Sequence, residues 1–280
     1  MAKLIDQIIF AGILIAVLVS PWLFGSVEFY AIDLLAAILL VLLLLWSVKA
    51  ALEKRLALLL TPIHWLLLAF VVFALVQSVA LGLELHRAAF GPSPSEIVTA
   101  GSGALSMDPS STKRAAMKLA MLVGYFFLAT NFITGSRRFS ITIIALILLG
   151  FSLALVATIH KFTSNGLILW FREAESIEVA FGPFANRNHF AGFLEMLMPL
   201  PLALIVAKGV QRDKWILYGF LAIALGTALV LSASRAALVV LAVQLFALPM
   251  IALKQRELQE RQEARGKTRE NLASGFLPLA

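Results

Sequence analysis

Apolar residues dominate this chain in long runs, one of which reads AIDLLAAILLVLLLLWSV from Ala31 to Val48. A helix needs about 20 predominantly apolar residues to cross the hydrocarbon core of a bilayer. The alternating ten-residue pattern of an outer-membrane barrel does not occur in the sequence. The pattern therefore predicts an all-α, polytopic integral membrane helical bundle with eight complete spans, at residues 5–24, 31–48, 62–81, 115–134, 139–159, 189–207, 215–232 and 236–253.

Composition supports a membrane protein and narrows its chemistry. Hydrophobic residues make up 61% of the 280 residues and charged residues 14%, against about 45–50% and about 25% in a typical soluble domain. The chain has no cysteine, which excludes disulfides and thiol chemistry. It contains no Walker loop, GxGxxG or GxSxG motif, and we expect no cofactor. Glu173, Glu175 and Glu178 lie close together but lack the ligand spacing of a metal site, so we expect no metal.

The connections between the spans set the expected domain boundaries. Residues 1–253 should form the transmembrane domain, with long loops on one side at about 82–114 and 160–188. Residues 254–271 mix charges of both signs without an apolar stripe, which indicates a solvated, basic cytoplasmic connection. Residues 272–280 read as the start of a further span, so the chain is expected to be truncated there.

Lysine and arginine are distributed unevenly between the two sides of the predicted bundle. With the N-terminus in the cytoplasm, 15 of the 23 Lys and Arg residues fall on the cytoplasmic side and 8 on the other. Positive charge favours the cytoplasmic side in short connections, so the count predicts a cytoplasmic N-terminus. Topology then accounts for most of the net charge of +7, which argues against a nucleic-acid partner.

Arg187 and Arg235 fall on the outer side, against this bias. Arg187 lies in the polar cluster at residues 186–189 that opens the sixth span, and Arg235 follows Ser234 in a short turn before the eighth. The plain interpretation is that each arginine anchors a helix end at the interface. Both also suit a lipid-linked diphosphate, because a guanidinium presents paired donors to phosphate oxygens. We therefore expect a diphosphate site at Arg187 and Arg235, supported by Ser234.

The neighbours of Arg187 offer further groups to this site. Asn186 and Asn188 can cap the helix or donate to a ligand, and the helix start adds free N–H groups. His189 is either a general base or, more ordinarily, an interfacial side chain with a satisfied hydrogen bond. Glu195, inside the span, is a functional candidate, but an ion pair with one of the two arginines is the preferred interpretation.

Two prolines interrupt the sixth span. Pro199 and Pro201 have no N–H to bond to the carbonyls four residues earlier, so they should kink this helix. A kink either opens space for a lipid tail or serves packing alone.

Three stretches resemble the O-antigen ligase family, whose superfamily also includes the O-antigen polymerases. LSMDPSSTKRAAMKLAMLVGYFFLA, residues 105–129, resembles the segment leading into the family's fourth span. FGPFANRNHFAGFLEMLMPLPLAL, residues 181–204, is close to the family's glycine-phenylalanine-asparagine-asparagine pattern before a proline-bearing helix. SASRAALVVLAV, residues 232–243, resembles its serine-arginine-small stretch at an outside helix start. The resemblance covers roughly residues 105–253, and the first three spans match in hydropathy only.

The resemblance implies a glycosyltransferase of the bacterial inner membrane that acts in polysaccharide assembly such as lipopolysaccharide biosynthesis. Members work at the periplasmic face without a metal and move a glycan from undecaprenyl diphosphate to an acceptor hydroxyl. Ligases use lipid A–core as acceptor and polymerases a growing glycan. Arginines near the outer face hold the diphosphate, which matches Arg187 and Arg235. A histidine in a later periplasmic loop is thought to activate the acceptor, and that region would follow Ala280, so the catalytic base is unassigned and His189 is only a candidate.

Other functions stay open at this point. A polymerase or exopolysaccharide enzyme would use the same donor. A transporter of lipid-linked glycans would carry ionisable residues across several helices, whereas Glu195 is nearly alone here. A non-catalytic membrane assembly partner is the third alternative. A continuation of the chain with a histidine-bearing periplasmic loop would favour the enzyme.

Overall fold

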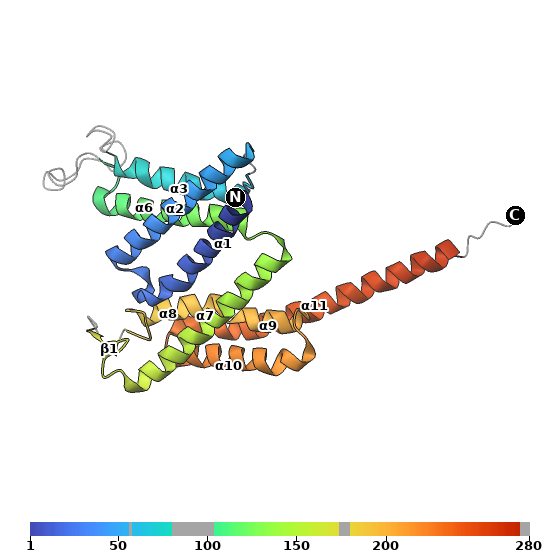
Figure 1. Cartoon of the computed structure of the whole chain (residues 1–280). Helices are drawn as coiled ribbons and strands as arrows, with labels where there is room; N and C mark the ends of the chain where they lie inside the picture. The colour runs from blue at the N-terminus through green and yellow to red at the C-terminus, as the bar shows by residue number, and fades with distance from the viewer. Residues whose placement is uncertain (56–57, 80–103, 174–179, 275–280) are drawn as a thin grey trace. The chain divides into compact units, whose positions relative to one another are not determined.

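The computed structural model describes residues 1–55, 58–79, 104–173 and 180–274 (Figure 1). Most of these residues are helical, and the strands among them are two short segments of one hairpin. The chain forms two compact units, Met1–Thr142 and Ile143–Ala280, here unit 1 and unit 2.

Apolar helices confirm the predicted class of an all-α membrane protein. Within the described residues, six helical segments are long and apolar enough to cross a membrane: Ala2–Trp22, Phe29–Glu53, Pro109–Phe132, Gly135–Thr163, Arg187–Val206 and Arg212–Leu231. Pro62–Ser78 and Arg235–Ile251 are shorter apolar helical segments. Each predicted span falls largely on one of these eight segments, but only six have the length of a complete span. The number eight therefore stays a prediction.

Unit 1 is built around a core shared by three helices. Its elements are α1 (Ala2–Val19), η1 (Ser20–Trp22), η2 (Phe24–Ser26), α2 (Phe29–Glu53), α3 (Pro62–Ser78), α6 (Pro109–Phe132) and the first turns of α7 (Gly135–Thr163). One face of α1 meets α2 and α6 through Ile5, Ile9, Ile13, Leu39, Leu42, Leu128 and Phe132. The spacings of three and four residues place these side chains on one face of each helix. Gly12 allows the close approach, because a Cβ there would lie 2.5 Å from Leu42 Cδ2.

A buried histidine joins α3 to α6 within unit 1. The Nδ1 atom of His64 accepts the Thr61 backbone N–H at 3.0 Å, so in the neutral ring Nε2 carries the proton. Nε2 can then donate to Thr130 Oγ1, 3.1 Å away on α6. Both ring nitrogens of His64 are therefore used in structure.

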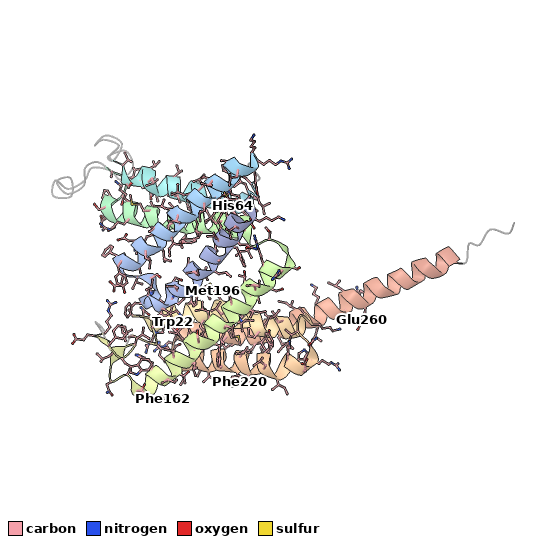
Figure 2. All side chains as sticks on the ribbon, in the orientation of Figure 1. Trp22, His64, Phe162, Met196, Phe220 and Glu260 are labelled. Carbon is pink, nitrogen blue, oxygen red and sulfur yellow. The ribbon has the colours of Figure 1, made fainter. Side chains whose placement is uncertain are left out.

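Unit 2 contains the rest of α7 and four further α-helices. They are α8 (Arg187–Leu197), α9 (Pro199–Val206), α10 (Trp215–Leu231) and α11 (Arg235–Ser274), with η3 (Arg212–Lys214) before α10. The strands β1 (Leu167–Ile168) and β2 (Arg172–Glu173) pair antiparallel inside the predicted outer loop. Phe220 on α10 is labelled in Figure 2. Its ring lies 5.8 Å from that of Phe151 on α7.

The sixth predicted span is interrupted at the expected place. α8 ends at Leu197, and α9 begins at Pro199. Because Pro199 has no N–H, the carbonyl of Glu195 lacks its helical partner. Gln244 of α11 fills the gap, since its Nε2 donates to the Glu195 carbonyl at 2.9 Å. The interruption is thus compensated by a hydrogen bond to another helix.

The basic segment after the eighth predicted span is helical. α11 continues through residues 254–271 to Ser274 as one helix of 40 residues (Figure 1). Glu257 and Arg261 are spaced four residues apart, in the order that favours helix stability. The predicted further span at 272–280 begins inside α11, and its residues 275–280 lie outside the described residues.

Candidate functional site

The loop before α8 wedges the start of that helix against α7. Phe181 and Phe184 exchange two backbone hydrogen bonds of 3.1 and 3.2 Å. Gly182 lies at their turn with φ +59°, and a Cβ there would approach Ala157 Cβ of α7 to 2.8 Å. The ring of Phe190 on α8 stands edge-on to both phenylalanines, at 5.0 and 5.6 Å. The motif FGPF therefore fixes where α8 begins.

An asparagine cap makes Arg187 the first residue of α8. The Asn186 side chain accepts the Asn188 backbone N–H at 2.8 Å, the hydrogen bond typical of an N-cap. Asn186 thereby acts on its own helix, in the first of the two roles predicted for it. Asn188 and His189 are exposed, and no partner contacts either side chain within the described ranges.

Two buried serines shape the turn that brings in Arg235. The Ser232 hydroxyl donates to the Leu229 carbonyl at 2.6 Å and accepts the Ser234 N–H at 3.3 Å. Ala233 between them adopts the left-handed conformation at φ +53°. The Ser234 hydroxyl accepts the Ala237 N–H at 3.5 Å, so Ser234 caps α11. Ser234 supports Arg235 by starting the helix that presents it.

Arg187 and Arg235 lie at the same end of unit 2. Short connections join α9 to α10 and α10 to α11, and α10 packs against both neighbours. Two such reversals make α11 run in the direction of α8 and α9, as Figure 1 shows. The Gln244–Glu195 contact lies nine residues into α11 and eight into α8, about 12–14 Å from each helix start. We call this end, where α8 and α11 begin, the arginine end.

The structure gives the two arginines no partner among the residues it describes. Arg187 is half-buried and Arg235 is exposed. Among the described residues neither guanidinium forms a hydrogen bond or an ion pair, and the three ion pairs found there all lie in unit 1. No side chain in the described ranges therefore uses the donors of either guanidinium.

Glu195 does not pair with them, contrary to the expectation from sequence. It lies eight residues after Arg187, about 12 Å along the helix, which is too far for the direct contact. Its side chain forms no ion pair within the described part of the chain. The residue contributes its backbone carbonyl instead, through the hydrogen bond to Gln244.

An apolar groove leads along α10 towards the arginine end. Its volume is about 560 Å³. Met198 and Leu202 line one side, Leu241 and Leu245 of α11 another, and α10 lines it from Gly219 to Leu231. The twelve helical steps from Gly219 to Leu231 correspond to about 18 Å. The groove thus has the apolar, elongated form of a site for a hydrocarbon chain.

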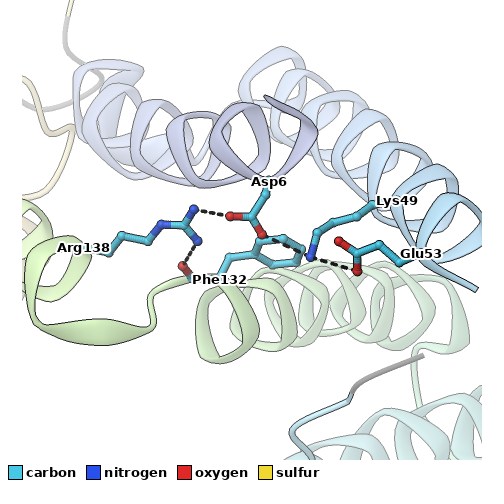
Figure 3. Close-up of polar contacts among 5 residues, drawn as sticks. All are labelled: Asp6, Lys49, Glu53, Phe132 and Arg138. Atoms are coloured by element: carbon cyan, nitrogen blue, oxygen red, sulfur yellow. Dashed lines mark hydrogen bonds and ion pairs between the residues drawn. The ribbon is translucent and has the colours of Figure 1, made fainter. Parts of the chain in front are cut away.

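A second charged cluster lies in unit 1, and sequence reasoning missed it (Figure 3). Asp6 of α1 bridges Arg138 of α7 and Lys49 of α2, whose Nζ is 3.2 Å from Oδ1. Lys49 also pairs with Glu53 at 3.6 Å, and Arg138 donates to the Phe132 carbonyl at 2.9 Å. The predicted orientation puts Asp6, Lys49 and Arg138 on the cytoplasmic side. Their shared side of the membrane was the feature of the sequence that could have indicated this cluster.

Neither a metal centre nor a known relative identifies the site. No group of three or more His, Asp and Glu side chains that could hold a metal occurs among the described residues. Two members of the acidic cluster noted in the sequence, Glu175 and Glu178, lie outside the described ranges. Comparisons with protein-family models, with curated proteins and with solved structures find no match to this chain.

Proposed function

We propose that this chain is a glycosyltransferase of the O-antigen ligase type, which binds an undecaprenyl diphosphate-linked glycan at the periplasmic face of the bacterial inner membrane. One observation carries the proposal. Arg187 and Arg235 begin two helices that run in the same direction, at one end of unit 2, and neither has an internal partner among the described residues. The three stretches that resemble the family add support.

The chemistry of the arginine end suits a diphosphate. Each guanidinium offers planar paired donors to phosphate oxygens and keeps its charge at any physiological pH. The starts of α8 and α11 add unbonded N–H groups and the positive ends of two helix dipoles. Because the low dielectric of the membrane strengthens such contacts, two unpaired arginines there favour an anionic ligand.

The apolar groove supplies a place for the carrier's tail. Its α10 wall ends at Leu231, four residues before Arg235. A diphosphate bound by Arg235 would therefore leave the first isoprene units near the groove. In this arrangement the tail stays among the helices while the glycan points away from them.

The transfer step follows from these positions. The acceptor hydroxyl oxygen attacks the anomeric carbon, and its proton passes to a general base. The bond between the anomeric carbon and the phosphate oxygen breaks, and its electron pair stays on the diphosphate. Arg187 and Arg235 stabilise the negative charge that grows there. The same step serves lipid A–core or a growing glycan as acceptor, so the donor site is common to ligase and polymerase.

A conservative substitution tests the bidentate contact. Arg187→Lys keeps the charge and loses the paired donors, so we expect binding of undecaprenyl diphosphate to weaken about tenfold, and Arg187→Ala to weaken it about 100-fold. Binding is measured on the full chain in lipid nanodiscs. Arg137→Lys is the matched control, because Arg137 is exposed and has no partner among the described residues. Wild-type affinity in Arg187→Lys would exclude a bidentate arginine clamp.

A further inference from the structure

A polar pocket of about 290 Å³ opens where α7 ends. We call it the α7 pocket, and its side-chain and loop walls include His160, Lys161, Ser164, Asn165, Ala180 and Phe181. Unlike the groove along α10, it gathers an imidazole, an ammonium, a hydroxyl and an amide. Small polar ligands are held by a few convergent groups of this kind.

His160 is fixed in one orientation at the pocket. Its Nε2 lies 2.5 Å from the Leu167 carbonyl, which can only accept, so Nε2 donates and carries the ring proton. In the neutral form of such a ring, Nδ1 is the hydrogen-bond acceptor. Trp170 stands edge-on to the ring at 5.3 Å, and its own Nε1 donates to Thr163 Oγ1 at 2.8 Å. These contacts hold the His160 ring in one orientation at the side of the pocket.

A tight turn presents the hydroxyl and the amide. The Ser164 N–H bonds to the His160 carbonyl at 3.0 Å, and the Leu167 N–H bonds to the Ser164 carbonyl at 2.9 Å. Asn165 and Gly166 occupy the left-handed region at φ +48° and +87°. Asparagine and glycine tolerate that conformation best among the natural residues. The described residues give neither the Ser164 hydroxyl nor the Asn165 amide a partner.

The pocket belongs to the same loop as the arginine end. Ala180 and Phe181 form part of its wall, and the chain continues from them into Asn186 and Arg187. Arg187 lies six positions after Phe181, which limits their separation to about 20 Å even for a fully extended chain. The paired backbone bonds of Phe181 and Phe184 fold this loop back on itself. Gly182 in this turn approaches Ala157, three residues before His160, so the α7 pocket and the loop that leads into Arg187 lie against the same end of α7.

We propose that the α7 pocket binds a sugar ring of the lipid-linked glycan whose diphosphate Arg187 holds. This proposal rests on the proposed function, and it assigns the sugar next to the diphosphate of the donor lipid to the α7 pocket. Sugar hydroxyls both donate and accept hydrogen bonds. Among the residues that line the pocket, the Ser164 hydroxyl can accept or donate a hydrogen bond, and Lys161 and Asn165 can donate one. A site built to bond hydroxyl groups rejects a ligand that lacks them, because its polar groups are then left unpaired.

Two lipids separate this inference from the proposed function. One is undecaprenyl diphosphate, and the other is undecaprenyl diphosphate bearing one N-acetylglucosamine. The double variant Ser164→Ala/Asn165→Gly removes both polar side chains, while glycine accepts the left-handed backbone at position 165 without strain. We expect it to bind the sugar-bearing lipid about tenfold more weakly than wild type. Its affinity for the sugar-free lipid should stay within about twofold.

Each other outcome rejects the pocket as a sugar site. Equal affinities of wild type and variant for the sugar-bearing lipid would show that these groups do not contact it. An equal loss for both lipids would show that the variant disturbs the arginine end or the fold. A wild-type protein that binds the sugar-free lipid as tightly as the sugar-bearing one would also overturn the inference, while leaving the diphosphate site intact. If the wild-type protein binds neither lipid, both the proposed function and the sugar site are rejected.

Discussion

Two groups of charged residues, one in each unit, are treated in opposite ways. In unit 1, Asp6, Lys49 and Arg138 come from three helices and satisfy one another (Figure 3). Their side chains are only 21–26% exposed. In unit 2, Arg187 and Arg235 begin two helices, and the described residues supply no partner for either. A partly buried charge that is bonded to neighbouring side chains supports the fold. A guanidinium without such neighbours keeps its hydrogen-bond donors available for a ligand.

This difference changes how a charge in an apolar sequence should be interpreted. An ionisable residue near a membrane is a functional candidate by default. Arg138 meets that description, yet its guanidinium donates to Asp6 and to the Phe132 carbonyl. The same group lies 5.1 Å from the Phe10 ring centre. Arg187 meets it too and has no such contacts among the described residues. For these two arginines, the internal contacts rather than the charge itself separate a residue that supports the fold from a candidate for ligand binding.

The largest effect should come from removing both free arginines. Arg187→Ala and Arg235→Ala should each weaken undecaprenyl diphosphate binding about 100-fold, as expected for a charge-assisted contact in a low-dielectric site. If both hold one diphosphate, the double variant should lose at least about tenfold less than the product of the single losses. The thermal midpoint in detergent should change little in all three. Strictly additive losses would separate the two arginines into independent sites, and a shared fall in midpoint would make them structural.

Removing the Asp6 carboxylate of unit 1 should lower the stability of the protein and leave lipid binding unchanged. Asp6→Ala leaves Lys49 and Arg138 partly buried without their shared partner, which should cost about 1–3 kcal/mol of stability. For a chain of this size the thermal midpoint should fall by about 3–10 °C. Lipid binding at the arginine end should stay at the wild-type level.

Asp33→Ala is the matched control for Asp6→Ala. Asp33 is exposed on α2, and the described residues show no ion pair for it. Its substitution should leave the midpoint unchanged. Equal effects of the two substitutions would remove the distinction between paired and unpaired carboxylates.

A smaller effect concerns the interrupted helix. Gln244→Leu removes the donor to the Glu195 carbonyl, and hydrogen bonds between membrane helices contribute about 0.5–1.5 kcal/mol. Pro199→Ala restores a backbone N–H that can reach the same carbonyl. Gln244→Leu should therefore cost less in the Pro199→Ala background than in wild type, by unfolding measured in detergent. An identical cost in both backgrounds would show that Gln244 stabilises the unit by packing alone.

Hydropathy predicted the all-α membrane class and the positions of the long helices. The length of an apolar run can be read directly from the sequence. The helices in two long apolar runs, α2 and α7, could therefore be predicted from hydropathy alone. The interruption at Pro199 was also predictable, because proline removes a backbone donor whatever surrounds it. The helical continuation of α11 through residues 254–271 was missed. A polar segment without an apolar stripe gives no period to detect, even where its residues favour helix.

The candidate site was predictable in its residues and not in its contacts. Charge topology singled out Arg187 and Arg235, and capping preference explains Asn186 and Ser234. The Glu195 ion pair was expected wrongly, because sequence spacing fixes a helix face and leaves open which neighbouring helix faces it. The hydrogen bond from Gln244, the cluster around Asp6 and the α7 pocket each join residues far apart in the chain or depend on turn geometry. Local patterns carry no information on such contacts.

The smallest effect concerns Asp108, an exposed carboxylate that caps α6 at its N-terminus. Hydrogen bonds from the Ser111 side chain, and then from its backbone N–H, hold the pKa of Asp108 below its ordinary value near 3.8. A lowered pKa means that the charged carboxylate stabilises the fold above that value, and that this contribution is lost as the pH falls through the folded-state pKa. Asp108→Asn keeps a capping oxygen and removes the titration. Wild type should therefore have the higher thermal midpoint at about pH 6, and the difference should narrow as the pH falls below the ordinary value near 3.8. A difference that persists at low pH would assign the effect to the shape of the cap rather than to its charge, and would place Asp108 outside the set of charges that unit 1 satisfies internally.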